Sequence, residues 1–230
     1  MSNPLEKYFS ERYKPSGDLQ KDPGPVVTIS REFGCPAKII SDLLASKLNE
    51  MPKHETPGVD WQVISKEILD DSARELKTEG SKIEYVFNYE KKPLIDEFLE
   101  SLSAKYYHSD WKIRDTIKKV IRSVGVDGHA IIIGRAAAQI NRDIEKSLHI
   151  RLVARFEWRV QHFANAHNIT TKEAVKKIKE LDENREKLIK SFATEGNCVQ
   201  CYDVYYSTEY LTNEEIVSSI LHLMQLKKLI

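Results

Sequence analysis

A short apolar run, a loop with a glycine and an amphipathic stretch constrain the fold of this chain more than any other feature. The run Val26-Val27-Thr28-Ile29 lies between Pro25 and Gly34 and is rich in β-branched residues, which predicts a buried strand. Apolar side chains recur at helical spacing over 38–48, which predicts a helix. A strand, a tight loop and a helix in this order direct backbone N–H groups and the positive end of the helix toward one point, so we expect an anion there, with phosphate the first hypothesis.

Composition narrows the classes of protein and partner to expect. The 230 residues suffice for one sizeable hydrophobic core, and 35 basic residues balance 35 acidic residues. A chain with zero net charge has no overall field that attracts a nucleic acid polymer or a membrane, so local residues must bind any anion. Three cysteines, no apolar leader segment and no long apolar run predict a cytoplasmic protein without disulfides. The oligomeric state stays open.

The chain divides into an arm and one domain. Residues 1–24 combine prolines and glycines with charged side chains, which predicts an irregular N-terminal arm. Residues 25–230 are expected to form a single domain. Within it, residues of about 66–125 show helical spacing but no strand pattern, which predicts a helical insertion beside the sheet.

Further strand and helix patterns alternate along this domain. Short apolar runs are separated by stretches with helical spacing, and the most apolar run, at 129–133, is typical of a strand that is covered on both faces. This alternation predicts an α/β fold with three layers and a parallel sheet. The strands are expected at 26–29, 61–64, 129–133, 148–153 and 204–206.

Charged residues follow several of the predicted strands. In a parallel sheet the carboxyl ends of the strands meet at one edge, where ligands bind, so we expect these side chains to lie close together. A phosphorylated ligand would make such a cluster of cations favourable. The alternative is that basic residues are common at strand ends because those ends are exposed to water. The strand ends carry Arg31, Glu32 and Gly34, then Ser65 and Lys66, then Gly134 and Arg135, and finally Arg155, of which only Gly34, Ser65 and Gly134 are uncharged.

Three short motifs carry a resemblance to a known family. Ile29-Ser30-Arg31-Glu32-Phe33-Gly34, Ile132-Ile133-Gly134-Arg135-Ala136 and Phe156-Glu157-Trp158-Arg159 resemble the cytidylate kinase-like family, which belongs to the nucleoside monophosphate kinases of the P-loop fold. The resemblance extends from about Pro25 to the C-terminal helix. It implies phosphoryl transfer from ATP to a nucleoside monophosphate, with Mg²⁺, in a cleft between the sheet, the helical insertion and a helical lid of about 155–195.

The resemblance also implies roles for individual residues. The residues expected to bind the ATP phosphates are Arg31, Gly34, Cys35, Pro36, Ala37 and Lys38. The residues expected to bind the acceptor substrate are Ser65, Gly134 and Arg135. The expected catalytic residues are Lys38, Arg159 and Arg185, whose positive charges would neutralise the transferring phosphoryl group. The metal ligands are undefined, with Ser30 and Glu32 as candidates that act through water.

The first loop departs from the usual phosphate-binding pattern, Gly-x-x-x-x-Gly-Lys-Ser/Thr. If Lys38 is the lysine of that pattern, Ala37 replaces the second glycine and Ile39 replaces the hydroxyl residue. If the loop is aligned on Gly34 instead, Pro36 removes an N–H donor. If Pro36 is the first residue of the helix, its missing N–H costs no hydrogen bond, because that N–H has no partner within a helix. Lys38 would then still reach the phosphates.

Two of these residues also have a purely structural interpretation. Arg185 lies between Leu181 and Leu188 on an apolar stripe, which favours a functional role, but with Asp182 it would also form an ordinary surface pair. Cys35 precedes a helix, whose N-terminus lowers the pKa of a thiol, but a small packed side chain is the alternative.

The sequence therefore leaves three hypotheses. The first is a phosphotransferase that moves the γ-phosphoryl group of ATP to a nucleoside monophosphate, of cytidylate type by resemblance. The second is a nucleotide-binding sensor or interaction protein with weak or no catalysis. The third is a kinase that acts on another acceptor, because a fold alone does not fix the substrate.

Overall fold

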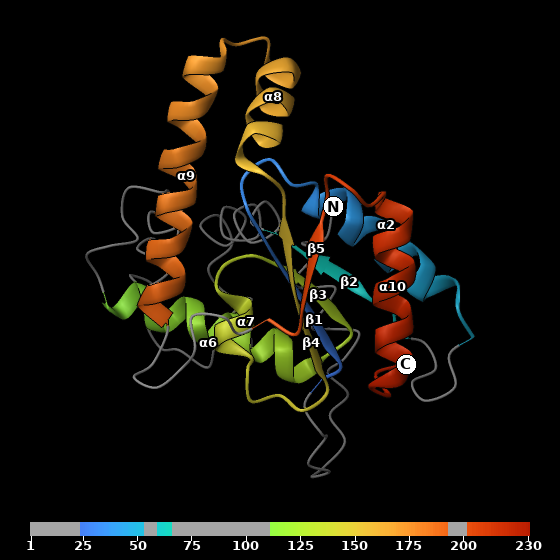
Figure 1. Cartoon of the computed structure of the whole chain (residues 1–230). Coiled ribbons are helices and arrows are strands. Elements are labelled where there is room, and N and C mark those ends of the chain that lie inside the picture. The colour runs from blue at the N-terminus through green and yellow to red at the C-terminus, as the bar shows by residue number, and fades with distance from the viewer. Residues whose placement is uncertain (1–23, 53–58, 66–110, 193–201) are drawn as a thin grey trace, which may run out of the picture.

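A parallel sheet forms the centre of the molecule (Figure 1). We analysed a computed structural model, which describes residues 24–52, 59–65, 111–192 and 202–230. The strands of these ranges are all parallel and lie in the order β2-β3-β1-β4-β5, which confirms the predicted α/β fold. They are β1 (Val26–Arg31), β2 (Gln62–Ile64), β3 (Ala130–Ile133), β4 (Ser147–Val153) and β5 (Val204–Ser207).

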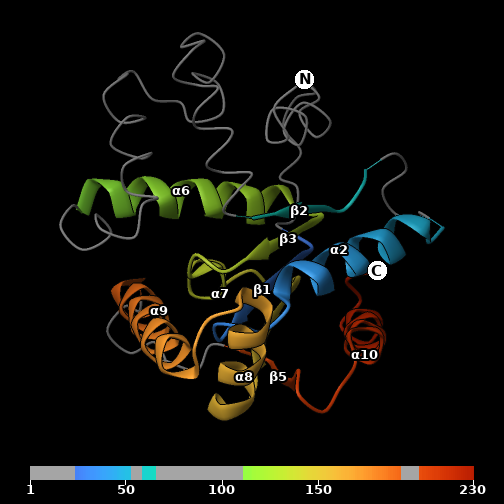
Figure 2. The same ribbon diagram turned by 90° about the horizontal axis from the view of Figure 1, so that it is seen from above.

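Helices cover both faces of the sheet, which gives the three predicted layers (Figure 2). On one face lie α2 (Ala37–Glu50) and α10 (Asn213–Leu226), which pack against each other. On the other face lie α6 (Trp111–Asp127) and the short α7 (Ala137–Ile140).

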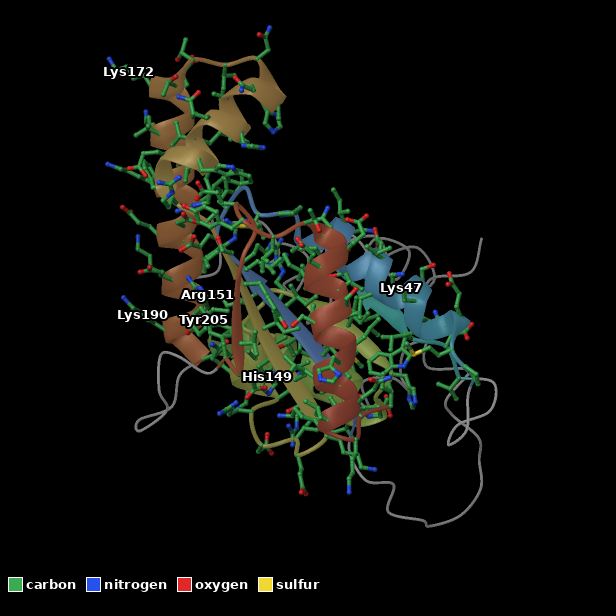
Figure 3. All side chains as sticks on the ribbon, turned by 45° about the vertical axis from the view of Figure 1, so that its right-hand side comes forward. Lys47, His149, Arg151, Lys172, Lys190 and Tyr205 are labelled. Atoms are coloured by element: carbon green, nitrogen blue, oxygen red, sulfur yellow. The ribbon has the colours of Figure 1, made fainter. Side chains whose placement is uncertain are left out.

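A helical hairpin follows β4 and extends beyond the carboxyl ends of the strands (Figure 1). It consists of α8 (Phe156–His167) and α9 (Thr171–Phe192), and it occupies most of the predicted lid region. Asn168 turns the chain between them in the left-handed conformation, with φ of 50°. Lys172 and Lys190, labelled in Figure 3, mark the two ends of α9.

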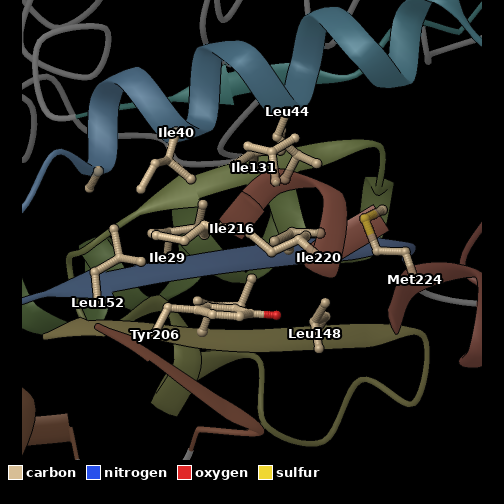
Figure 4. Close-up of a cluster of buried hydrophobic side chains, with 14 of the residues drawn as sticks. Ile29, Ile40, Leu44, Ile131, Leu148, Leu152, Tyr206, Ile216, Ile220 and Met224 are labelled. Atoms are coloured by element: carbon tan, nitrogen blue, oxygen red, sulfur yellow. The ribbon is translucent and has the colours of Figure 1, made fainter. Parts of the chain in front are cut away.

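The main hydrophobic core lies between the sheet and the α2/α10 layer (Figure 4). Side chains alternate along a strand, so one set of residues in each strand faces these two helices. Ile29 is fully buried and pairs in register with Ile133 of β3 and Ile150 of β4. The Thr212 and Glu215 side chains form a capping box that begins α10 and fixes its first turn against this core. Other members of the core are Val27, Ile40, Leu44, Leu48, Ile131, Leu148, Leu152, Tyr206, Ile216, Val217, Ile220 and Met224.

The opposite face of the sheet carries a buried polar network. His149 of β4 is fully buried, with Nδ1 2.8 Å from Thr28 Oγ1 and Nε2 3.1 Å from Ser147 Oγ. The Ser147 hydroxyl donates to the carbonyl of Ile144 at 2.6 Å, so its oxygen accepts the proton of Nε2. Nδ1 then accepts from the Thr28 hydroxyl, and the network is complete only with a neutral imidazole.

Some predictions concern residues outside the described ranges. They include nearly all of the N-terminal arm, the helical insertion as far as residue 110, and the end of the lid region. The remainder of the predicted insertion lies in α6. Among the described residues, no helix is both long and apolar enough to cross a membrane.

The His149 network predicts a loss of stability in mild acid. Burial lowers the pKa of His149 from an ordinary 6.5 to about 4, while Asp203 opposes the shift and Arg142 and Lys227 add to it. Between these values the unfolded chain binds a proton that the folded chain does not, so acid favours unfolding. We expect the free energy of unfolding, measured with urea, to fall by about 2 kcal/mol from pH 6.5 to pH 5. The same slope should persist in His162→Gln, which changes an exposed histidine, and a flat profile in the wild-type protein would contradict the prediction.

Candidate functional site

The loop after β1 is a tight turn whose backbone bonds are largely internal. Gly34 has φ of +95°, a left-handed conformation that glycine adopts without strain. The amide of Cys35 donates to the carbonyl of Glu32 at 3.3 Å, and the amide of Ala37 donates to the carbonyl of Cys35 at 2.9 Å. Pro36 has no N–H, and its carbonyl accepts the first helical bond of α2, so the helix begins at Ala37 and Pro36 is its N-cap rather than its first residue. These amides are therefore not directed at a ligand in this conformation.

A buried arginine fastens this loop to the hairpin. The Arg159 side chain is 7% exposed, and its Nε donates to the carbonyl of Ala154 at 3.1 Å. Its Nη1 donates to the carbonyl of Phe33 at 3.2 Å and to Asp182 Oδ2 at 2.5 Å. Glu32 Oε2 lies 3.4 Å from Nε and also accepts from the Ala154 amide. Arg159 thus joins the ends of β1 and β4 to α9.

Helix α9 contributes an acid and a second arginine to the same place. Asp182 Oδ1 accepts from the amide of Phe33 at 2.8 Å. Arg185 Nη1 lies 3.5 Å from Asp182 Oδ1, and the guanidinium lies over the Phe33 ring, 5.1 Å from its centroid. Burial lowers the pKa of Arg185, and Asp182 opposes this shift, so the group remains a cation at neutral pH. Its buried Nη1 has no hydrogen-bond acceptor within the described ranges.

Cys35 lies beside this network as a protonated thiol. Burial raises the pKa of Cys35, and the hydrogen bond to Thr208 only partly offsets it. The sequence suggested that the helix N-terminus would lower this pKa, and the structure reverses the direction because the side chain is packed inside. The structural alternative for Cys35 is therefore the better one.

A second group of residues lies where β3 ends. Gly134, Arg135 and Ala136 have φ of 71°, 56° and 55°, three consecutive residues in the left-handed region. A Cβ on Gly134 would lie 2.5 Å from Nη1 of Arg31, so the Arg31 guanidinium lies against this backbone. Residues other than glycine rarely adopt this backbone conformation, because their Cβ atom makes it strained. Backbone strain of this kind is typical of functional sites. The ends of β1 and β3 thus bring Arg31 and the Gly134-Arg135 pair together, as expected.

Lys38 is not part of either group. Its exposed Nζ lies 2.6 Å from Asp42 one turn further along α2. Ile39, at the position of the hydroxyl residue in the usual pattern, is 58% exposed. Ser65 is buried at the end of β2, and its hydroxyl meets no partner among the described residues.

Comparison with known proteins identifies the family. The sequence model of the cytidylate kinase-like family matches residues 26–209, from β1 to just beyond β5. The chain belongs to the cytidylate kinase-like family. This match confirms the resemblance seen in the sequence motifs and indicates a kinase-like, nucleotide-binding protein, without giving the substrate.

A solved structure shares the fold. A crystal structure described as an uncharacterized protein from Eubacterium ventriosum superposes with a TM-score of 0.55 at 16% identity. The superposition covers 87% of this chain and 98% of the other. No curated protein matches this chain.

Membership of a kinase-like family implies a bound Mg²⁺, so some of the described residues should be able to bind this ion. The described residues contain no cluster of three or more His, Cys, Asp or Glu side chains that would hold an ion. The carboxylates of Glu32 and Asp182 are bound by Arg159 and by backbone amides, and the Ser30 hydroxyl accepts from Tyr202 at 3.0 Å. These residues do not fit a directly coordinated Mg²⁺, so we assign no chemical step to a protein-bound metal.

The sequence motifs did not assign a site role to Phe33 or Asp182. The sequence did single out Asp182, because Asp182-Glu183-Asn184-Arg185 is similar to the acidic-then-Arg pattern of the family's lid region, but its spacing of three residues from Arg185 is also that of a surface pair. The bond of Asp182 to Phe33 joins residues 149 positions apart, so no local pattern predicts it.

The burial of Arg159 predicts a strong effect on stability. Replacing Arg159 by Met should lower the free energy of unfolding by about 3 kcal/mol, because Asp182 and two carbonyls lose a buried partner. Lys190→Met is the control, since Lys190 lies on α9 and pairs with Glu186 at 3.8 Å, with 64% and 61% of the two side chains exposed. We expect that control to change stability by less than about 1 kcal/mol. Equal effects in urea denaturation would contradict the assigned role of Arg159.

Proposed function

We propose that this chain binds ATP at the carboxyl edge of the sheet and transfers its γ-phosphoryl group to a nucleoside monophosphate. The observation that supports this most is Arg185. It is a partly buried cation beside the loop after β1, with 31% of its side chain exposed and Asp182 Oδ1 at 3.5 Å from Nη1. Among the described residues this Nη1 has no closer acceptor that would complete a hydrogen bond. A phosphoryl oxygen would supply the missing acceptor, and charge-assisted bonds of this type are strong. In phosphoryl transfer such cations act by stabilising charge on the equatorial oxygens.

The group of residues at the ends of β1 and β3 has the charge needed to bind the acceptor nucleotide. Arg31 lies against Gly134, and Arg135 follows in the same strained segment. Two arginines at neighbouring strand ends match the charge of a monophosphate. By family resemblance, the acceptor is of cytidylate type, and the specificity for the base would come from residues that the motifs do not define.

The pairing of Lys38 with Asp42 is compatible with a catalytic role for Lys38. Lys38 and Asp42 form an exposed i,i+4 pair, and such pairs contribute only about 0.3–0.5 kcal/mol. A bound triphosphate would therefore attract Lys38 away from Asp42 at little cost. Ile39, in contrast, has no group that binds a metal.

Nucleotide binding without turnover is the second candidate. It is favoured by Pro36, which lacks an N–H, and by the internal bonds of the Cys35 and Ala37 amides, because a phosphate-binding loop needs these donors. Both candidates use the same edge of the sheet and differ only in whether the phosphoryl group is transferred.

A coupled assay of ADP release distinguishes them. ATP, Mg²⁺ and a panel of nucleoside monophosphates should give turnover with at least one acceptor, and Lys38→Ala should lower kcat by about 100-fold. Lys47→Ala, at the other end of α2, should leave kcat unchanged (Figure 3). Calorimetric binding of ATP without turnover for any acceptor would favour the second candidate. Turnover that survives Lys38→Ala would remove Lys38 from the catalytic residues.

A further inference from the structure

The Asp182 carboxylate has surroundings that resemble those of a bound phosphate. It accepts from the Phe33 amide at 2.8 Å and from Arg159 Nη1 at 2.5 Å, and Arg185 Nη1 lies 3.5 Å away. One backbone amide of the first loop and two guanidinium groups are the donors that proteins use for phosphoryl oxygens. In this conformation the donors hold a side chain of the protein itself.

We propose that Asp182 occupies the position of a ligand phosphoryl group and competes with that ligand for the same donors. This inference rests on the proposed function, because it assigns the loop after β1 as the phosphate site. The Phe33 amide has one hydrogen, so a phosphoryl oxygen that accepts from it must displace Asp182 Oδ1. Displacement breaks a direct bond between α9 and the loop and leaves Arg185 to pair with the ligand.

The packing of the hairpin supports such a release. Helices α8 and α9 share a small apolar cluster that is separate from the main core of the sheet. Phe33 joins this cluster from the loop, with its ring 4.8 Å from that of Phe163 in edge-to-face contact. The hairpin therefore keeps its own packing when the polar bond to the loop breaks. The cluster consists of Val160, Phe163, Ala164, Ala174 and Ile178, with Phe33, Phe156, Ile169 and Val175 at its margin.

Competition of this kind lowers the affinity of the free protein. A site that is blocked in all but one tenth of the molecules binds its ligand about tenfold more weakly than an open site. A triphosphate still displaces Asp182 because it carries several negative charges where the carboxylate carries one. The opposite role, in which Asp182 positions Arg185 for the ligand, predicts weaker binding when the carboxylate is removed.

The test compares Asp182→Asn with Glu183→Gln. The first substitution removes the competing charge but keeps the shape, and the second removes the charge of an exposed neighbour on the same helix. We expect Asp182→Asn to bind inorganic triphosphate and ATP about 10-fold more tightly than the wild-type protein by calorimetry. Glu183→Gln should bind within about twofold of the wild-type protein. If circular dichroism shows that Asp182→Asn does not fold, the test passes to hydrogen exchange of the wild-type protein, which needs no variant.

Hydrogen exchange of the wild-type protein gives an independent measurement. Inorganic triphosphate should increase amide exchange in the middle of α9, because the bond to the loop is lost. Unchanged or slower exchange there, with triphosphate bound, would overturn the inference.

The outcomes separate this inference from the proposed function. Equal or weaker binding by Asp182→Asn, with a wild-type protein that binds ATP, overturns the inference and leaves the proposed function standing. Tighter binding without turnover for any acceptor supports the inference and overturns the transfer reaction. Absence of triphosphate binding by both proteins overturns both proposals.

Discussion

The structure at the carboxyl ends of the strands depends on the hydrogen bonds and ion pairs of the buried Arg159 guanidinium. A guanidinium with 7% of its side chain exposed is stable only when its charge and its N–H groups are matched. Asp182, Glu32 and two backbone carbonyls supply that match, and they come from three different parts of the chain. The sheet itself places the ends of β1 and β4 side by side, and the need to satisfy one cation fastens the α8/α9 hairpin to both of them.

If the site binds phosphate as proposed, this arrangement changes which groups are available to bind it. A usual phosphate-binding loop offers its amides to the ligand, whereas here Cys35 and Ala37 use theirs within the turn and Phe33 uses its amide for Asp182. The available positive charge comes from side chains instead, in particular Arg185. Guanidinium groups match two phosphoryl oxygens at once, so they suit this task. Binding that relies on side chains of a hairpin links ligand affinity to the position of α9.

Much of the fold was predictable from the sequence, because strand and helix periodicities are local. The apolar run that became β3, the helix that begins at the Thr212 capping box and the parallel sheet all followed from patterns within a few residues. The charged side chains at the strand ends were also identified, and Arg31 does lie against Gly134. The pairing of Asp182 with Phe33 and the burial of Cys35 depend on contacts between distant segments, which no local pattern encodes.

An amide NMR titration with ATP tests the central claim most directly, that phosphate binds between the loop after β1 and α9. The account predicts that the largest shift changes occur at Phe33, in the turn that follows it and at Arg185, with smaller changes at Gly134 and Arg135. Changes confined to the Lys38 and Asp42 region of α2, or spread over the exposed lysines of α9, would contradict it.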